Sequence, residues 1–193
     1  MTPADVVVVP FGGRRIPRQL RGLPVVDLET VTAHRRVVVV GSDADLAAVL
    51  TRLLRADRLD VEVGHVNSRW GARRVVDGAA ARVPLIRDET ATVIVGAAEW
   101  RGDPADNPLR GEAVVDDAVL FDGEVAGVRV EPTTTMPGLR AAVLGAGPRR
   151  WLTGRAAQLG TPGATVVRDG VAAARPLRRS TFYRHTEGWL RVR

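Results

Sequence analysis

Residues 37–54, VVVVGSDADLAAVLTRLL, decide the fold class of this chain. Four consecutive Val residues predict a strand that is buried on both faces, as in a parallel sheet. After Gly41 the apolar residues take the spacing of a helical stripe, at Leu46, Val49, Leu50, Leu53 and Leu54. Ser42, Asp43 or Asp45 can cap the start of that helix. A buried strand that runs through a glycine turn into a helix predicts a βαβ unit and therefore a parallel α/β sheet.

The surrounding sequence extends this lobe on both sides. A second Val run at residues 6–9 ends at Pro10 and is followed by Gly12 and Gly13, and residues 60–66 (DVEVGHV) predict a strand after the helix. Residues 24–31 (PVVDLETV) have room for a shorter strand. The residues before position 100 therefore predict a parallel sheet with helical layers, of the strand–helix–strand type.

The second half of the chain predicts antiparallel structure. Asp122-Gly123 and Asp169-Gly170 each stand between two apolar runs, which is a strong hairpin signal. Residues 101–110 (RGDPADNPLR) are polar and contain two Pro, so we expect a linker there. The fold class expected is α/β, with a parallel-sheet lobe over residues 1–100 and a smaller antiparallel β-rich lobe over residues 111–193.

Composition narrows the class of protein. The 193 residues are 45% hydrophobic and 26% charged, which excludes a disordered chain, and the absence of Cys excludes a disulfide framework, a thiolate metal site and a Cys nucleophile. No apolar run approaches the ~20 residues of a membrane-spanning helix. The first five residues lack the basic region of a secretory signal, so a cytoplasmic location is the expectation.

All 28 basic residues are Arg, and the net charge is +6. The absence of Lys is explained by codon bias in a GC-rich genome, although Arg also suits phosphate recognition. Seven Arg stand against Asp169 and Glu187 in residues 168–193, whereas the preceding residues are nearly balanced. The excess charge therefore belongs to the last 26 residues.

Two interpretations fit the turn after residue 40. Gly41 would let the backbone approach an anion closely, and the amide groups of the helix start would point at it. Asp43 would repel a phosphate there unless Mg²⁺ or a ribose hydroxyl lies between them. The alternative is an ordinary strand–helix connection with an Asp cap.

The segment resembles the Gly-Gly-Asp-Gly-Thr signature of the diacylglycerol kinase, lipid kinase and NAD kinase superfamily. That signature also follows a Val-rich strand and opens a Leu- and Val-rich helix. Three further segments are similar to the family. Residues 6–13 (VVVVPFGG) resemble its opening strand and phosphate loop, residues 60–72 (DVEVGHVNSRWGA) fall where it has its Pro-x-Gly-Thr-x-Asn-Asp segment, and residues 166–171 (VVRDGV) resemble its late Asp-Gly-Glu hairpin.

The resemblance implies an NAD kinase-like two-lobed fold and phosphoryl transfer from ATP, with Mg²⁺, to a hydroxyl of a lipid or small molecule. Asp43 would hold the nucleotide and Asp169 would act near the acceptor. No protein-held metal cluster is expected. The nucleotide site implied by the resemblance comprises Gly12, Gly13, Gly41, Ser42, Asp43, Asp45 and Asn67.

Several residues depart from the family pattern. Ser42, Ala44 and Asp45 stand where the signature has Gly, Gly and Thr, and Val171 stands where the late hairpin has Glu. Asp45 adds a negative charge beside the expected phosphate, and Val171 removes the expected base. A non-catalytic binding or regulatory module with the same fold, a pseudokinase, is therefore the alternative to a kinase.

The basic segment of residues 178–185 (RRSTFYRH) supports a third hypothesis. Arg178, Arg179 and Arg184 are candidate ligands for a phosphate, a nucleic-acid backbone or an anionic membrane surface. The alternative is a final strand with solvated Arg side chains. Nucleic acid ranks last because aromatic residues are only 4% of the chain. The three His residues are far apart and have no metal-ligand spacing.

Overall fold

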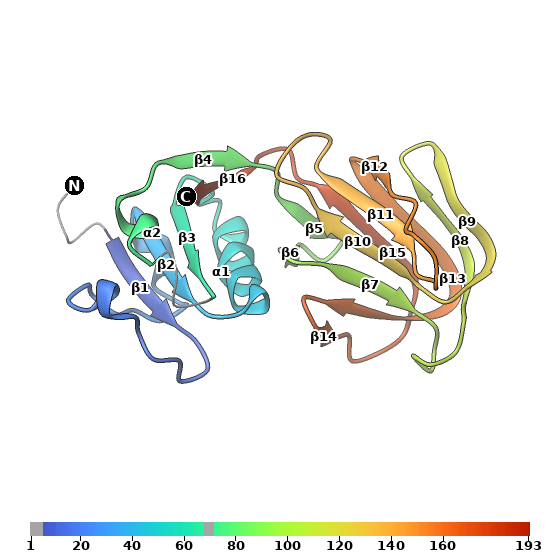
Figure 1. Cartoon of the computed structure of the whole chain (residues 1–193), viewed down its shortest axis with the longest axis horizontal. Helices are drawn as coiled ribbons and strands as arrows, with labels where there is room; N and C mark the ends of the chain where they lie inside the picture. The colour runs from blue at the N-terminus through green and yellow to red at the C-terminus, as the bar shows by residue number, and fades with distance from the viewer. Residues whose placement is uncertain (1–5, 68–71) are drawn as a thin grey trace. The chain divides into compact units, whose positions relative to one another are not determined.

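The computed structural model describes residues 6–67 and 72–193, and the chain forms two compact units. Unit 1 comprises residues 1–83 together with 187–193, and unit 2 comprises residues 84–186. The elements of each unit can be followed in Figure 1. The fold class expected from the sequence is confirmed: one unit carries a mainly parallel sheet and the other a large antiparallel sheet.

The sheet of unit 1 has the strand order β1-β2-β3-β16-β4 among the described residues. Strands β1, β2, β3 and β16 run parallel, and β4 is antiparallel to β16. Their bounds, with those of the helical elements, are β1 Val6–Pro10, η2 Arg18–Leu20, η3 Val31–Ala33, β2 Arg36–Val40, α1 Asp43–Arg55, β3 Glu62–Val66, α2 Arg74–Asp77, β4 Ala80–Val83 and β16 Trp189–Val192.

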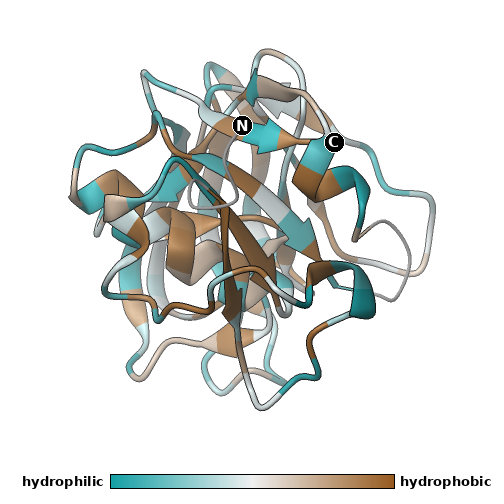
Figure 2. Cartoon of the chain, turned by 90° about the vertical axis from the view of Figure 1, so that its left-hand side faces the viewer, coloured by the Kyte–Doolittle hydropathy of each residue, from teal (hydrophilic) through white to brown (hydrophobic). Residues whose placement is uncertain are grey.

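Both faces of this parallel sheet are covered, which is why β1 and β2 are continuous Val runs. Val38 and Val40 of β2 pack on one face with Leu20 and Val75. Val37 and Val39 point to the opposite face, because successive side chains of a strand alternate. Helix α1 contacts β2 and buries its stripe of Leu46, Ala47, Val49, Leu50 and Leu53. In Figure 2, brown hydrophobic colour concentrates on the inner strands and teal on the surrounding loops.

Unit 2 is built from antiparallel strands around Trp100 and Phe182, whose rings stack with centroids 5.6 Å apart. Its long strand β13 (Ala156–Arg168) pairs with β15, β7 and β8 in different stretches. The other strands are β5 Ile86–Asp88, β6 Val93–Ile94, β7 Ala98–Arg101, β8 Leu109–Val115, β9 Ala118–Val125, β10 Val128–Pro132, β11 Leu139–Val143, β12 Leu152–Gly154, β14 Val171–Ala172 and β15 Leu177–Arg184.

Two expected elements differ from the structure. Residues 24–31 form no strand and contribute a single bridge, Val8 to Val25, along the edge of β1. Asp122-Gly123 is not a turn but lies within β9, opposite Gly111 and Glu112 of β8. The turn of that hairpin is at Asp116, which has a φ of 49°. Aspartate tolerates this left-handed conformation, so the neighbouring acidic pair makes the turn instead.

The boundaries of the units also differ from the expected lobes at residues 1–100 and 111–193. Strand β7 (Ala98–Arg101) hydrogen-bonds to β10 and β13 and so belongs to unit 2. Strand β16 returns to unit 1 and pairs with β3, although its residues are the last of the chain. In the parts of the chain that the structure describes, no helix is long and apolar enough to cross a membrane.

Candidate functional site

The carboxyl ends of β1, β2 and β3 bring three separate loops together at one edge of the parallel sheet. The Phe11 amide donates to the Val40 carbonyl at 3.0 Å, and the Gly41 amide donates to the Val66 carbonyl at 3.2 Å. The ladder of hydrogen bonds therefore continues one residue past the strands. This edge is where open α/β sheets bind ligands. It gathers seven of the residues that the sequence singles out, namely Gly12, Gly13, Gly41, Ser42, Asp43, Asp45 and Asn67.

Asp45 closes the turn between β2 and α1 with its own side chain. Its Oδ2 accepts from the Ser42 amide at 2.7 Å and from the Ser42 hydroxyl at 2.8 Å, and the Asp45 amide donates back to Ser42 Oγ at 3.3 Å. This is a capping box. A Cβ at Gly41 would lie 2.6 Å from Asp45 Oδ2, so the carboxylate lies directly against the Gly41 backbone. An internal carboxylate thus takes the Ser42 amide at the start of the helix.

Asp43 is the carboxylate that remains open at this edge. It is the first residue of α1, and its side chain is 48% exposed. His65 of β3 lies beside it: Nδ1 is 3.9 Å from Asp43 Oδ1, and Nε2 is 3.1 Å from the Gly41 carbonyl. Because a carbonyl only accepts, Nε2 carries a proton in this contact. Desolvation and the charge of Arg193 lower the pKa of Arg191 on β16, whereas the charge of the Asp43 carboxylate raises it by less.

The loop after β1 supplies room and positive charge. Gly12 and Gly13 have φ values of 58° and 65°, and a Cβ at either would meet no atom within 4 Å. Arg14 and Arg15 follow, and both are exposed. Asn67, at the end of β3, is exposed as well. Ser68, which follows Asn67 in the segment of residues 60–72, lies outside the described residues.

The described residues do not offer a metal site of their own. No group of three or more His, Asp or Glu residues among them could hold a metal ion. At the edge of the sheet the only two acidic side chains in the α1 turn are Asp43 and Asp45, and Asp45 is engaged with Ser42. A Mg²⁺ ion here would depend on the phosphates of a nucleotide for its other ligands.

Asp169 lies in unit 2, at the turn between β13 and β14, and has a φ of 47°. The Asp169-Gly170 turn is where the sequence predicts it. Both oxygens of the carboxylate accept backbone amides: Oδ1 accepts from Gly96 and Ala97 at 2.7 and 3.0 Å, and Oδ2 accepts from Val95 at 3.0 Å. The side chain therefore fixes the segment between β6 and β7. The neighbouring Val171 is 61% exposed.

The three candidate arginines of β15 do not form one cluster. Arg178 and Arg179 are exposed at the start of the strand, beside the irregularity in its pairing with β13. Arg184 lies six residues after Arg178, which is roughly 20 Å along an extended strand. Its Nη1 donates to the Pro137 carbonyl at 3.0 Å. Arg184 thus holds the loop before β11.

Sequence reasoning gave His65, Arg14 and Arg15 no role in the site. A signal for His65 was available, because it is the penultimate residue of a strand parallel to β2 and pairs with Val39. The ends of neighbouring parallel strands meet at one edge, so a polar side chain there faces the same ligand space. Arg14 and Arg15 follow the glycine pair directly, in the loop that leaves the carboxyl end of β1.

No protein-family model and no curated protein matches the sequence. Solved structures do match over nearly the whole chain. An NAD kinase from Archaeoglobus fulgidus in complex with ATP superposes with a TM-score of 0.68 at 13% identity, over 97% of this chain and 93% of that one. A diacylglycerol kinase structure from Bacillus anthracis gives 0.72 at 10% identity, over 98% and 96%. A putative diacylglycerol kinase from the same organism gives 0.74 at 9% identity, over 98% and 97%. This chain shares the two-lobed fold of these NAD kinase and diacylglycerol kinase structures.

Proposed function

We propose that the chain is a nucleotide-binding module that holds its ligand at the carboxyl edge of β1–β3 and does not transfer the phosphoryl group. The observation that carries this proposal is the position of Asp45. Its carboxylate lies against Gly41 and accepts the amide and the hydroxyl of Ser42, the N-cap residue of α1. A close phosphate contact at this turn is therefore opposed by a fixed negative charge, whereas the rest of the edge stays open.

The open part of the edge suits the sugar and the outer phosphates of a nucleotide. Asp43 offers an exposed carboxylate, which accepts hydrogen bonds from ribose hydroxyl groups without a metal. Arg14 and Arg15 offer charge-assisted hydrogen bonds to phosphate oxygens, and the turn at Gly12 and Gly13 leaves space for them. ATP is the nucleotide of the NAD kinase structure with this fold.

The residues do not favour phosphoryl transfer. A base must reach the hydroxyl of the acceptor, and both oxygens of Asp169 already accept backbone amides. Val171, next to that turn, has no proton acceptor in its side chain. The Mg²⁺ that neutralises charge in such reactions would have Asp43 alone as an open protein ligand in the α1 turn.

ATP-dependent phosphoryl transfer to a lipid or small-molecule hydroxyl is the second candidate. The fold shared with NAD kinase and diacylglycerol kinase structures favours it. In this case Asp43 would hold the nucleotide, and Asp169 would act near the acceptor.

Isothermal titration calorimetry of the whole chain with ATP tests the binding proposal. We expect one site, with affinity reduced at least tenfold by Asp43→Asn. Asp57→Asn is the matched control, because Asp57 lies beyond the other end of the same helix and its left-handed backbone accepts Asn. Equal effects of the two variants, or no heat at millimolar ATP, would reject the site.

A radiolabel transfer assay separates the two candidates. The chain is incubated with γ-labelled ATP, Mg²⁺ and diacylglycerol or NAD, and we expect no labelled product. Labelled product that disappears in Asp43→Asn would establish the kinase alternative instead.

A further inference from the structure

The imidazole of His65 lies at the carboxyl edge of unit 1, beside the carboxylate of Asp43. Strand β3 is parallel to β2, and His65 pairs with Val39. Paired residues of neighbouring strands point to the same face of a sheet, so His65 lies on the face that α1 covers. Asp43 is the first residue of α1. The end of β3 and the start of the helix thus bring an imidazole and a carboxylate together at the proposed nucleotide site.

The hydrogen bond from His65 to the main chain decides which ring nitrogen stays free. Nε2 lies 3.1 Å from the Gly41 carbonyl, which only accepts, so Nε2 carries the proton. In the neutral imidazole Nδ1 is then an acceptor. The His65 side chain is only 15% exposed, so packing holds the ring in this orientation. His65 therefore presents a fixed acceptor nitrogen at this edge.

Nδ1 of His65 and the Asp43 carboxylate are two acceptors that face each other. Nδ1 lies 3.9 Å from Oδ1, which is longer than a charge-assisted hydrogen bond of about 2.7–2.9 Å, so the two groups are not hydrogen-bonded to each other. Within the described residues, neither Nδ1 nor the carboxylate accepts a hydrogen bond from another side chain or amide. Two neighbouring acceptors of this kind are satisfied by donors from a ligand or from water.

We propose that His65 and Asp43 together bind the cis-diol of a ribonucleotide. One sugar hydroxyl donates to Asp43, and the neighbouring hydroxyl donates to Nδ1 of His65. His65 is then a specificity-determining residue that favours ribose over deoxyribose. This inference rests on the proposed nucleotide site and adds a second protein contact to the sugar.

The chemistry of the pair favours the sugar over the phosphates. Neither acceptor can donate to a phosphate oxygen, and the Asp43 carboxylate also repels a phosphate charge. Arg14 and Arg15 supply donors for phosphates at the same edge. The sugar is bonded directly to those phosphates, so its hydroxyl groups are the nearest donors of the ligand that can reach the pair.

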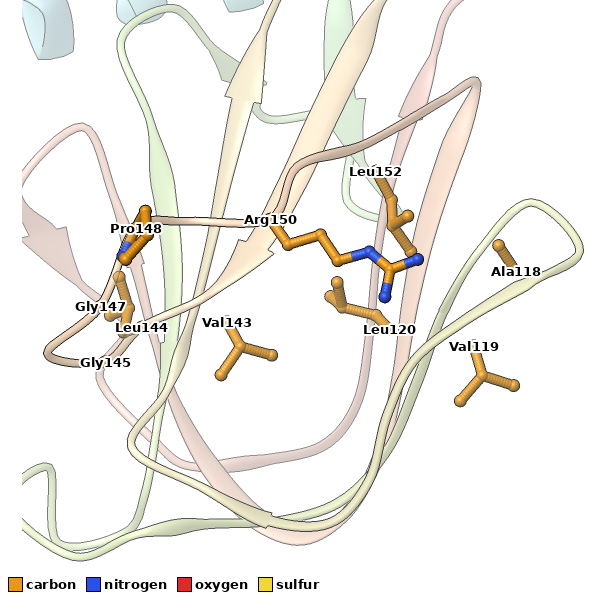
Figure 3. A pocket seen from close by; sticks show the side chains of 10 residues that line it. All are labelled: Ala118, Val119, Leu120, Val143, Leu144, Gly145, Gly147, Pro148, Arg150 and Leu152. Atoms are coloured by element: carbon orange, nitrogen blue, oxygen red, sulfur yellow. The ribbon is translucent and has the colours of Figure 1, made fainter.

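The described lining of the depression in unit 2 offers no such pair of side-chain acceptors. The depression lies between the start of β9, the end of β11 and the loop that leads into β12, and Arg150 is the charged residue among those that line it (Figure 3). A guanidinium donates and never accepts, so it cannot accept a hydrogen bond from a sugar hydroxyl. Arg150 therefore provides a control for a triphosphate that binds by charge alone.

The size of the effect follows from the acceptor that a deoxynucleotide leaves without its donor. A lost hydrogen bond of this type weakens binding about fivefold for the neutral His65 and about tenfold or more for the charged Asp43. Removal of the His65 ring cancels only the first of these two penalties.

Calorimetry of the whole chain with ATP, 2′-deoxyATP and 3′-deoxyATP tests this inference. The wild-type chain should bind both deoxynucleotides at least about fivefold more weakly than ATP. In His65→Leu, one deoxynucleotide should bind within about twofold of ATP, because the hydroxyl that it lacks no longer has a partner. The other should keep its disadvantage, because Asp43 is still present. A purely structural role of His65 would weaken all three ligands by the same factor and would overturn the proposal.

Two matched variants control for the substitution and for charge. His34→Leu makes the same change just before β2, at the opposite edge of the sheet, and should leave the ratios of the three affinities unchanged. Arg150→Ala in unit 2 should leave them unchanged as well. A loss of the preference for ribose in either variant would contradict the assignment to His65.

The wild-type comparison needs no variant, so it decides the question even if His65→Leu does not fold. ATP that binds without any preference over both deoxynucleotides would overturn this inference and leave the nucleotide site in place. The absence of ATP binding at millimolar concentration would reject the nucleotide site itself, and this inference with it.

Discussion

Replacing Asp45 by asparagine removes one negative charge from the start of α1 while keeping a side chain of the same shape. Oδ2 accepts both the amide and the hydroxyl of Ser42, at 2.7 and 2.8 Å. An amide oxygen can accept the same two donors without the charge. The weaker hydrogen bonds and the lost helix-dipole interaction should together lower the free energy of unfolding by about 1–2 kcal/mol.

The same change should strengthen nucleotide binding. At about 5 Å and an effective dielectric constant of 20 to 80, one carboxylate repels one phosphate charge by about 1–3 kcal/mol. Asp45→Asn should therefore raise the affinity for ATP at least fivefold, while the affinity for adenosine stays within about twofold. Stability and ATP affinity thus change in opposite directions.

Two measurements check this prediction. Urea denaturation gives the free energy of unfolding, and calorimetry gives the affinities for ATP and adenosine. If Asp45→Asn leaves ATP affinity unchanged or lowers it, the carboxylate does not lie near the phosphates, and the reasoning about the turn after Gly41 fails. If adenosine affinity rises as much as ATP affinity, the effect is not electrostatic.

Three further predictions concern stability. Gly41→Ala places a Cβ 2.6 Å from Asp45 and should cost about 1–3 kcal/mol in urea denaturation, whereas Gly147→Ala, which meets no atom within 4 Å, should stay within about 0.5 kcal/mol. Arg168→Met leaves the fully buried Asp88 without the cation 2.6 Å from its Oδ2, and should lower the free energy of unfolding by about 3–5 kcal/mol. Desolvation raises the pKa of Glu131, but its hydrogen bonds from two arginines lower it by more, so the net pKa lies below 4.5. The charged Glu131 carboxylate therefore stabilises the folded chain above about pH 4.5, and thermal melts should show this stabilisation being lost as the pH falls below that value.

Much of unit 1 follows from local sequence. The Val runs of β1 and β2 and the apolar stripe of α1 are signals within a few residues of each other, and the structure has all three elements. Ser42 and Asp45 also form a local pattern, because Ser-x-x-Asp is close to the capping-box sequence. The capping role of Asp45 therefore follows from the sequence, and its hydrogen bonds to Ser42 confirm it.

Other features depend on partners that are distant in sequence. Asp122-Gly123 and Asp169-Gly170 are the same dipeptide, yet only the second is a turn. The first lies within β9, where it pairs with Gly111 and Glu112 of β8. The return of β16 to β3 joins residues 190 and 62. The Arg184 guanidinium likewise donates a hydrogen bond to the Pro137 carbonyl, and the sequence of β15 gives no signal for this distant partner. Pairings of this kind are set by the packing of the whole unit, and no local pattern encodes them.

The most direct test of the nucleotide-binding account is a crystal structure of the chain grown with ATP. We expect an intact triphosphate at the carboxyl edge of β1–β3, with the ribose hydroxyls on Asp43, phosphate oxygens on Arg14 or Arg15, and the Asp45–Ser42 hydrogen bonds retained. A nucleotide bound elsewhere, an Asp45 side chain displaced by phosphate at Gly41, or crystals without nucleotide at millimolar ATP would contradict it.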